Sequence, residues 1–169
     1  ASRRAPHAPV AHADDPRLRA FAAALEQVCI DLAQLVVRDG EGAQKFVEIR
    51  VAGASDDASA RRAGLAIANS PLVKTAIAGA DANWGRVVMA LGKSGEPLDP
   101  EKLSVAFGGT VITAGGGIVA GYDERVVAAH LAGSEIEIAV DLGVGCGRSV
   151  VWTCDLTHGY IDINADYRS

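Results

Sequence analysis

The sequence predicts a mixed α/β fold in which helices and strands are interspersed along the chain. Three observations support this class. Apolar residues recur every three or four positions over 21–36, which is the spacing of an amphipathic helix. They alternate with other residues over 47–51 and 136–142, which is the spacing of strands with one buried face. Glycine-rich turns separate short β-type runs, so we expect several neighbouring strands to be antiparallel.

The first predicted element is a long helix that begins at Asp15 and ends at Arg38. Asp15 can accept a hydrogen bond from the first turn, and Pro16 needs no backbone donor there. Gly40 follows the helix and favours its end. Residues 1–13 show no periodicity, and we expect a flexible lead-in. The apolar stripe of the helix consists of Phe21, Leu25, Val28, Leu32, Leu35 and Val36.

The middle of the chain combines one strand, over 47–51, with shorter helices. Acidic residues open a predicted helix over 56–69, and Ser70-Pro71 restarts a short one that ends near Ile77. A strand over 72–77 remains the alternative for that short helix. The spacing of Trp84, Val87, Val88 and Leu91 predicts a further helix over 83–91.

The C-terminal half is predicted to be rich in strands. Two short β runs flank Gly108-Gly109, which indicates a hairpin. The segment Gly143-Val144-Gly145-Cys146-Gly147 contains three glycines, but a strand-like run follows it instead of the helix that a dinucleotide-binding loop requires. We therefore expect a hairpin turn there. The remaining predicted elements are a helix over 122–131 and strands over 136–142, 150–156 and 161–163.

Composition excludes several classes of function. The 169 residues are 49% hydrophobic and 22% charged, which is typical of a globular protein and not of a disordered one. A net charge of −5 argues against a nucleic-acid partner. No uninterrupted apolar run reaches the roughly 18 residues of a membrane span. The three cysteines form no CxxC pair and the four histidines have no metal-ligand spacing. We expect a soluble cytosolic protein without a metal.

Three segments are candidates for ligand contact. The first, Arg38-Asp39-Gly40-Glu41-Gly42-Ala43, places charges between glycines directly before a strand, where a carboxylate can hold an ammonium group. The second, Asp81 to Arg86, puts an arginine near a helix start, where a cation is not stabilised. The third is the tail from Ile161 to Ser169, if a strand holds it in place. Each also has a purely structural interpretation: a solvated turn, an internal ion pair and a docked strand.

Taken together and in order, these segments resemble one family. The resemblance rests on VRDGEGA with Lys45, ANSPLVKTA at 68–76, NWGR at 83–86, WTCDLT at 152–157 and INADYRS at 163–169. Tyr122-Asp123-Glu124, Asp81 and Leu131-Ala132-Gly133 match as well. The chain resembles the C-terminal part of the ornithine acetyltransferases, which are the bifunctional glutamate N-acetyltransferases of arginine biosynthesis.

The resemblance implies a fold and a reaction. Family members are precursors that cut themselves into α and β chains, and the threonine exposed at the start of the β chain is the nucleophile. It takes the acetyl group of N-acetylornithine and passes it to glutamate. The implied fold is the C-terminal part of an N-terminal-nucleophile-like α/β sandwich plus a small α/β domain. The implied divisions are a lead-in at 1–13, the back of the sandwich at 14–69 and a C-terminal domain at 70–169.

The resemblance also assigns residues. Glu41 and Asn164 match substrate contacts of the family, and Ser169 keeps the hydroxyl of a terminal threonine. The nucleophilic threonine and the oxyanion-stabilising residues have no counterpart here, so we expect no catalytic residue in this chain and no activity of the chain alone. The implied partners are the α chain, N-acetylornithine, glutamate and further αβ units. No cofactor is implied beyond acetyl-CoA, which some members accept as acetyl donor.

Two other interpretations stay open from the sequence. The chain could be a non-catalytic remnant or binding module that kept the fold and lost the nucleophile. Alternatively, it could belong to an amidohydrolase or aminopeptidase with the related self-cleaving fold, which fits the terminal-nucleophile chemistry but not the quoted motifs.

Overall fold

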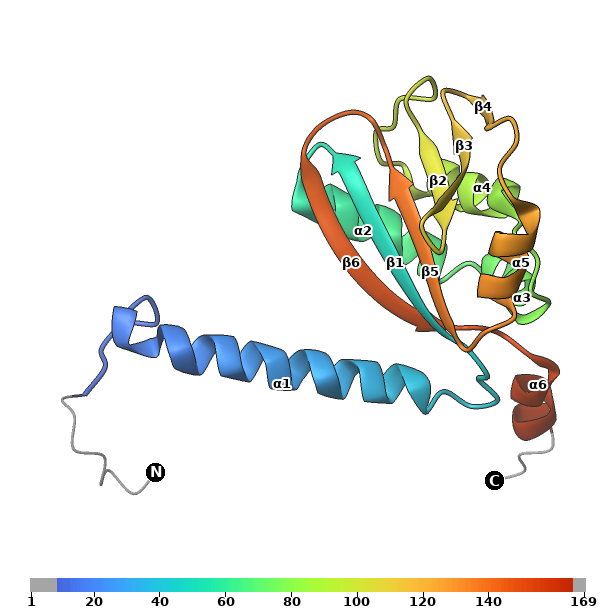
Figure 1. The fold of residues 1–169 in the computed structure, drawn as a ribbon. Helices are drawn as coiled ribbons and strands as arrows, with labels where there is room; N and C mark the ends of the chain where they lie inside the picture. The colour runs from blue at the N-terminus through green and yellow to red at the C-terminus, as the bar shows by residue number, and fades with distance from the viewer. Residues whose placement is uncertain (1–8, 166–169) are drawn as a thin grey trace. The chain divides into compact units, whose positions relative to one another are not determined.

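A computed structural model describes residues 9–165 of the chain (Figure 1). The chain separates into two compact units, Ala1–Val36 and Val37–Ser169, and each is described by itself.

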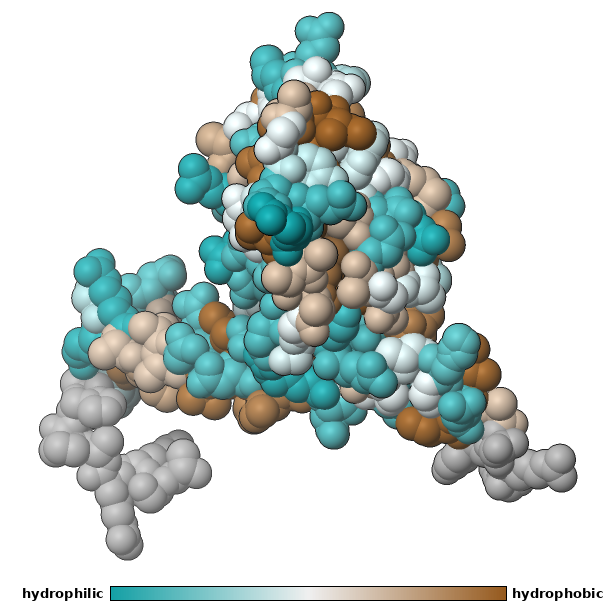
Figure 2. Space-filling view, turned by 45° about the vertical axis from the view of Figure 1, so that its right-hand side comes forward, coloured by the Kyte–Doolittle hydropathy of each residue, from teal (hydrophilic) through white to brown (hydrophobic). Residues whose placement is uncertain are grey.

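From Pro16 onward the first unit is helical. A short 3-10 helix, η1 (Pro16–Leu18), leads into α1 (Arg19–Arg38), and the Asp15 side chain caps its start by accepting from the Arg17 backbone N–H at 2.9 Å. The predicted long helix is therefore confirmed. Its apolar stripe is exposed: Phe21 is 64%, Leu25 49% and Leu32 57% exposed. Figure 2 shows this stripe as hydrophobic side chains along one edge of the helix.

By length and composition, the segment Pro16–Arg38 also passes the test for a membrane-spanning helix. This segment is not an uninterrupted apolar run, because polar residues such as Glu26 and Asp31 lie within it. Core helices of soluble proteins and signal sequences near an N-terminus pass the same test.

The second unit is built on a six-stranded mixed sheet with the order β4-β3-β2-β5-β1-β6 (Figure 1). β1 is parallel to β5, whereas every other neighbouring pair is antiparallel. The predicted mixed α/β class is confirmed. The strands are β1 (Phe46–Ala54), β2 (Ser104–Phe107), β3 (Thr110–Ala114), β4 (Gly117–Ile118), β5 (Glu135–Asp141) and β6 (Gly147–Cys154).

Helices α2 and α4 pack against one face of this sheet (Figure 1). Asp56, Ser70 and Asn83 cap α2, α3 and α4, each through a side-chain oxygen that accepts a backbone N–H three residues on. The predicted short helix is thus α3, and the strand alternative is excluded. The helices are α2 (Asp57–Ala68), α3 (Pro71–Ala78), α4 (Trp84–Ser94), α5 (Glu124–Leu131) and α6 (His158–Ala165).

The two faces of the sheet differ in character because side chains alternate along each strand. Ile49 and Ile138 are fully buried in the core, where side chains such as Ile67 of α2 pack. Arg50 lies on the opposite face and forms ion pairs with Glu48 at 2.6 Å and Glu137 at 3.1 Å. One sheet face is therefore apolar and the other carries paired charges.

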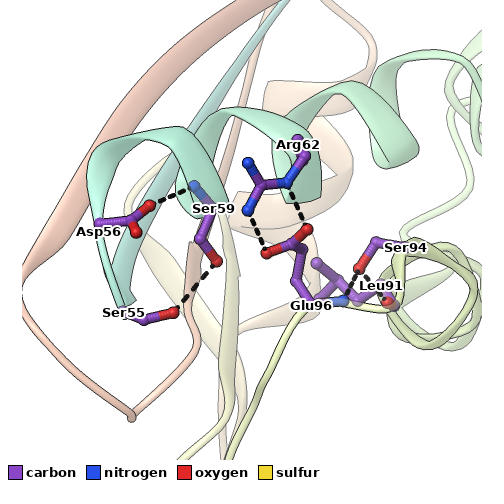
Figure 3. A network of polar contacts seen from close by, with 7 residues as sticks. All are labelled: Ser55, Asp56, Ser59, Arg62, Leu91, Ser94 and Glu96. Atoms are coloured by element: carbon purple, nitrogen blue, oxygen red, sulfur yellow. Dashed lines mark hydrogen bonds and ion pairs between the residues drawn. The ribbon is translucent and has the colours of Figure 1, made fainter.

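A polar network joins α2 to the segment after α4 (Figure 3). Arg62 of α2 donates twice to Glu96, through Nε at 2.5 Å and Nη2 at 3.0 Å. These bonds lower the pKa of the Glu96 carboxyl from 4.5 to about 2. Ser94 Oγ donates to the Leu91 carbonyl and accepts from the Glu96 backbone N–H, which fixes the segment that carries the acid.

Two sequence-based expectations were wrong. Residues 161–163 are not a strand but part of α6, whose start Thr157 caps by accepting from the Gly159 N–H. Residues 143–147 do not form a hairpin turn, because β5 and β6 are not neighbours; both flank β1. The turn instead passes the end of β1, where Gly53 O accepts from the backbone of the turn.

The sheet continues across the predicted domain boundary at residues 69/70. β1 lies on one side of that boundary, and β5 and β6, to which it is hydrogen-bonded, lie on the other.

Candidate substrate site

The structure brings together two of the three residues predicted to contact substrate. Glu41 lies in the loop 39–45 between α1 and β1, and Asn164 lies in the last turn of α6. Asn164 Nδ2 donates to Glu41 Oε2 at 2.7 Å, across 123 positions of sequence. Both residues are exposed, so this pair is accessible to a ligand. The third predicted residue, Ser169, lies outside the described residues.

The hydrogen bonds of Asn164 determine what the pair can recognise. Nδ2 also donates to the Tyr160 carbonyl at 2.9 Å, so both amide protons have acceptors. Because a carboxylate and a carbonyl can only accept, the orientation of the amide is fixed. Asn164 Oδ1 and Glu41 Oε1 have no hydrogen-bond partner within residues 9–165. The pair therefore presents two acceptors, an arrangement suited to a cationic donor such as an ammonium group.

The loop that carries Glu41 touches the start of α6 directly. Gly42 has a φ of +70°, and a Cβ there would lie 2.4 Å from the Tyr160 backbone nitrogen. A Cβ on Gly159 would in turn lie 3.2 Å from the Gly42 Cα. Thr157 Oγ1 donates to the Gly42 carbonyl at 2.6 Å and accepts from the Gly159 N–H at 3.1 Å. The backbone next to Glu41 is thus tied to the helix that holds Asn164.

The end of the same loop is held by a buried carboxylate. Asp155, only 3% exposed, accepts through Oδ1 from the backbone N–H groups of Gln44 at 2.8 Å and Lys45 at 3.0 Å. Its other oxygen, Oδ2, is buried without a hydrogen-bond partner among the residues described. Asp155 therefore holds the loop through Oδ1 and through its backbone N–H, which donates to the Lys45 carbonyl at 3.2 Å.

Lys45 connects the base of this loop to two helices. Its Nζ donates to the carbonyls of Ile77 at 2.9 Å and Leu131 at 2.7 Å, near the ends of α3 and α5. A cation at these C-terminal carbonyls is favoured by the helix dipoles. The site loop is thereby anchored to the helices beside the sheet.

Arg38, at the opposite end of the loop, is a structural residue. Its guanidinium forms a bidentate ion pair with Glu135 at the start of β5, with Nη2 to Oε2 at 2.8 Å, and lies 3.9 Å from the Phe46 ring centroid. The arginine holds the pKa of the Glu135 carboxyl below its usual range. Of the charges in this motif, Glu41 is the one that pairs with Asn164.

A cavity of about 440 Å³ lies between α3, α6 and the loop. Gln44 and Thr157 reach it from the loop and from the residue before α6. It adjoins the segment that carries the Glu41–Asn164 pair but does not include either residue. Its walls are Gln44, Thr75, Ala78, Gly79, Leu156, Thr157, His158 and Ile161.

The second predicted cluster is structural. Arg86 Nη1 donates to the Leu72 carbonyl at 2.8 Å and to Thr75 Oγ1 at 3.3 Å, which ties α4 to α3. Asn83 caps α4 as expected. No group of three His, Cys, Asp or Glu residues within 9–165 could hold a metal ion.

Sequence reasoning missed the residues that hold the pair in place. Thr157 and Asp155 both belong to the motif WTCDLT, and the sequence alone assigns no role to either residue. Threonine is a favoured residue directly before a helix, where its hydroxyl accepts a backbone N–H of the first turn. The bond to Gly42 has no such local signal, because it spans 115 positions.

The fold and the site define the class of protein: a mixed α/β protein with helices packed on one face of its sheet and an exposed Glu41–Asn164 pair. A family model described as the ArgJ family matches residues 1–169. The chain belongs to the ArgJ family.

Relatives and a solved structure agree with this assignment. The arginine biosynthesis bifunctional protein ArgJ of Gluconobacter oxydans is 65% identical over 156 residues, covering 92% of this chain and 37% of the relative. The protein of the same name from Ruegeria pomeroyi is 64% identical, covering 88% and 36%. The crystal structure of ArgJ from Bacillus halodurans matches with a TM-score of 0.89 at 40% identity, covering 95% of this chain and 75% of that one. This chain thus spans less than two-fifths of the length of these two relatives.

Proposed function

We propose that this chain is the substrate-binding portion of a glutamate N-acetyltransferase of arginine biosynthesis. In the proposed reaction a threonine outside the chain removes the acetyl group from N-acetylornithine and releases ornithine. The resulting acetyl-threonine then passes its acetyl group to the amine of glutamate and regains its hydroxyl. The observation that carries the proposal is the contact between Glu41 and Asn164, which the family resemblance assigns to substrate and which lie 123 positions apart.

The chemistry of the pair suits these substrates. N-acetylornithine keeps the side-chain ammonium group of ornithine, and glutamate carries an α-ammonium group at neutral pH. Each of these cations needs acceptors and a compensating negative charge. Glu41 Oε1 and Asn164 Oδ1 provide two acceptors, and Glu41 provides the charge. Ser169 is proposed as a third contact through its hydroxyl.

The rest of the proposal concerns the whole protein. We infer a partner α chain produced by self-cleavage of a common precursor, further association of αβ units, and a cytoplasmic location. Acetyl-CoA is proposed as a second acetyl donor. The exposed apolar stripe of α1 supports a partner, because large apolar side chains aligned in this way are typical of a surface that another element covers.

The test is an acetyl-transfer assay of the full-length protein that contains this chain. Wild type should convert N-acetylornithine and glutamate to ornithine and N-acetylglutamate. Glu41→Gln should raise KM for N-acetylornithine by about 10- to 100-fold, because a hydrogen bond to a charged group contributes roughly 1.5–3 kcal/mol. Asp39→Asn is the matched control, since Asp39 is an exposed carboxylate of the same loop without a partner among the described residues.

Three outcomes would contradict the proposal. Equal kinetic effects of Glu41→Gln and Asp39→Asn would remove Glu41 from the site. Binding of ornithine without any transfer by the wild type would favour a non-catalytic module. Hydrolysis of amide substrates in preference to transfer would favour an amidohydrolase.

A further inference from the structure

We propose that Thr157 is a positioning residue that sets Glu41 and Asn164 at the spacing which substrate requires. This inference rests on the proposed function of that pair. Its hydroxyl donates to the carbonyl of Gly42, the residue after Glu41, at 2.6 Å. The same hydroxyl accepts from the N–H of Gly159, in the first turn of the helix that carries Asn164, at 3.1 Å. One side chain therefore joins both halves of the pair.

Only a hydroxyl can perform both tasks at this position. An Asp would accept from the Gly159 N–H as a helix cap, but a carboxylate has no proton to give to the Gly42 carbonyl. An Ala or Val would leave both backbone groups without this partner. Capping α6 requires only that the Thr157 hydroxyl accept from the Gly159 N–H. The hydrogen bond that the same hydroxyl donates to the Gly42 carbonyl is therefore not needed to begin the helix.

The position of α6 depends on such polar contacts because the helix is not held by burial. It has eight residues, none of which is buried, and a helix this short is marginal on its own. The described contacts of α6 with the loop are the Thr157 hydroxyl, the close approach of Gly42 to Gly159, and the Asn164–Glu41 bond itself. Without the Thr157 bonds, the Asn164–Glu41 hydrogen bond would be the one described side-chain bond left between the helix and the loop.

The chain offers a closely matched control in Thr153. Its Oγ1 also donates to a backbone carbonyl, that of Ala68 at 3.2 Å, and also accepts, from Lys74 Nζ at 3.1 Å. Both threonines are half-buried. Among the residues described, the Thr153 hydroxyl bonds neither the loop 39–45 nor α6, so its loss tests the structural cost of removing such a hydroxyl without removing a bond at the pair.

The experiment compares Thr157→Val, Thr157→Ser and Thr153→Val in the full-length protein. Thr157→Val should raise KM for N-acetylornithine roughly tenfold while kcat changes less than about threefold, because binding is lost and not the reacting groups. Thr157→Ser restores the hydroxyl and should return KM to within about twofold of wild type. Thr153→Val should lower the melting temperature comparably and leave KM within about twofold. Equal KM values for both valine variants, or no rescue by serine, would overturn the inference.

Hydrogen exchange separates failure of this inference from failure of the proposed function. In Thr157→Val, backbone amides of 40–45 and 158–165 should exchange several-fold faster together, and in Thr153→Val they should not. This readout needs no catalysis. If the wild type is inactive but Thr157→Val still speeds exchange in both segments, the acetyltransferase proposal is contradicted and the role of Thr157 in connecting loop and helix is supported. If exchange in Thr157→Val rises in only one of the two segments, the proposed connection through Thr157 is contradicted.

Discussion

At the scale of single residues, existing hydrogen bonds and steric limits fix the geometry of the site. Both N–H groups of the Asn164 amide already donate hydrogen bonds, to Glu41 and to the Tyr160 carbonyl. Asn164 can therefore offer only its Oδ1 acceptor to a ligand. Gly42 has a positive φ and no room for a Cβ. A small set of atoms therefore fixes the direction in which Glu41 is presented.

Gly42→Ala tests this constraint. The methyl group would meet the Tyr160 nitrogen at 2.4 Å, on a backbone with φ of +70°, so the free energy of unfolding should fall by about 1–3 kcal/mol. Urea unfolding measures the change. Gly92→Ala is the control: it lies in α4 with nothing within 4 Å of its Cβ, so the same chemical change should stabilise by about 0.5–1 kcal/mol. Two changes of the same sign and size would contradict the steric argument.

At the scale of elements, the spacing of apolar residues predicted the strands and helices of the core, because the residues of each buried face follow one another within a single short segment. Val47, Ile49 and Val51 alternate in the sequence and are buried together in β1. The same alternation misled at Ile161 and Ile163, which are exposed residues of α6. What fixes α6 is Thr157 and the distant loop around Gly42, and a contact over 115 positions leaves no local pattern.

The candidate site likewise has residues that the sequence predicts and a long-range contact that it does not. Glu41 could be singled out because charges between glycines before a strand are unusual, and Asn164 entered through the family motif. Their mutual hydrogen bond could not be predicted, since it depends on α6 replacing the expected strand. Arg86 shows the converse: its awkward place at a helix start suggested an anionic partner, and the structure supplies the Leu72 carbonyl.

The bond between Arg62 and Glu96 gives the packing of α2 beside α4 a pH dependence. The pKa of Glu96 is lowered from 4.5 to about 2 by the arginine, so the charged form is favoured in the folded state. Its contribution to stability is present above about pH 4.5 and is lost as pH falls toward 2. The difference in free energy of unfolding between wild type and Glu96→Gln should therefore shrink from pH 5 to pH 2.

Urea unfolding at a series of pH values measures this difference. Glu101→Gln is the control, because Glu101 is exposed and its side chain has no ion pair among the residues described. Its difference from wild type should stay flat over the same range. A flat profile for Glu96→Gln would show that the ion pair contributes nothing to folding.

At the scale of the whole molecule, the chain has two kinds of surface. The unit from Val37 onward buries its own core, with Ile49, Ile138 and Phe107 almost inaccessible. The unit before it buries none of its large apolar side chains within α1. A chain that spans less than two-fifths of two ArgJ relatives leaves room for a partner surface in the remainder, which is why we propose one.

Leu32→Ala tests whether the remainder of the protein covers α1. Leu32 is 57% exposed here, so in the 169-residue chain the substitution should change the free energy of unfolding by less than about 0.5 kcal/mol. In the full-length protein, where we propose that the stripe is buried, the same substitution should cost about 2–5 kcal/mol. Gln27→Ala is the control on α1: its side chain donates to Asp31 on the surface at 2.8 Å and has no other bond among the described residues, so its effect should be small in both contexts. A Leu32→Ala effect that is small in both would leave the stripe uncovered by the rest of the protein, and stable partitioning of the full-length protein into lipid vesicles would assign it to a membrane instead.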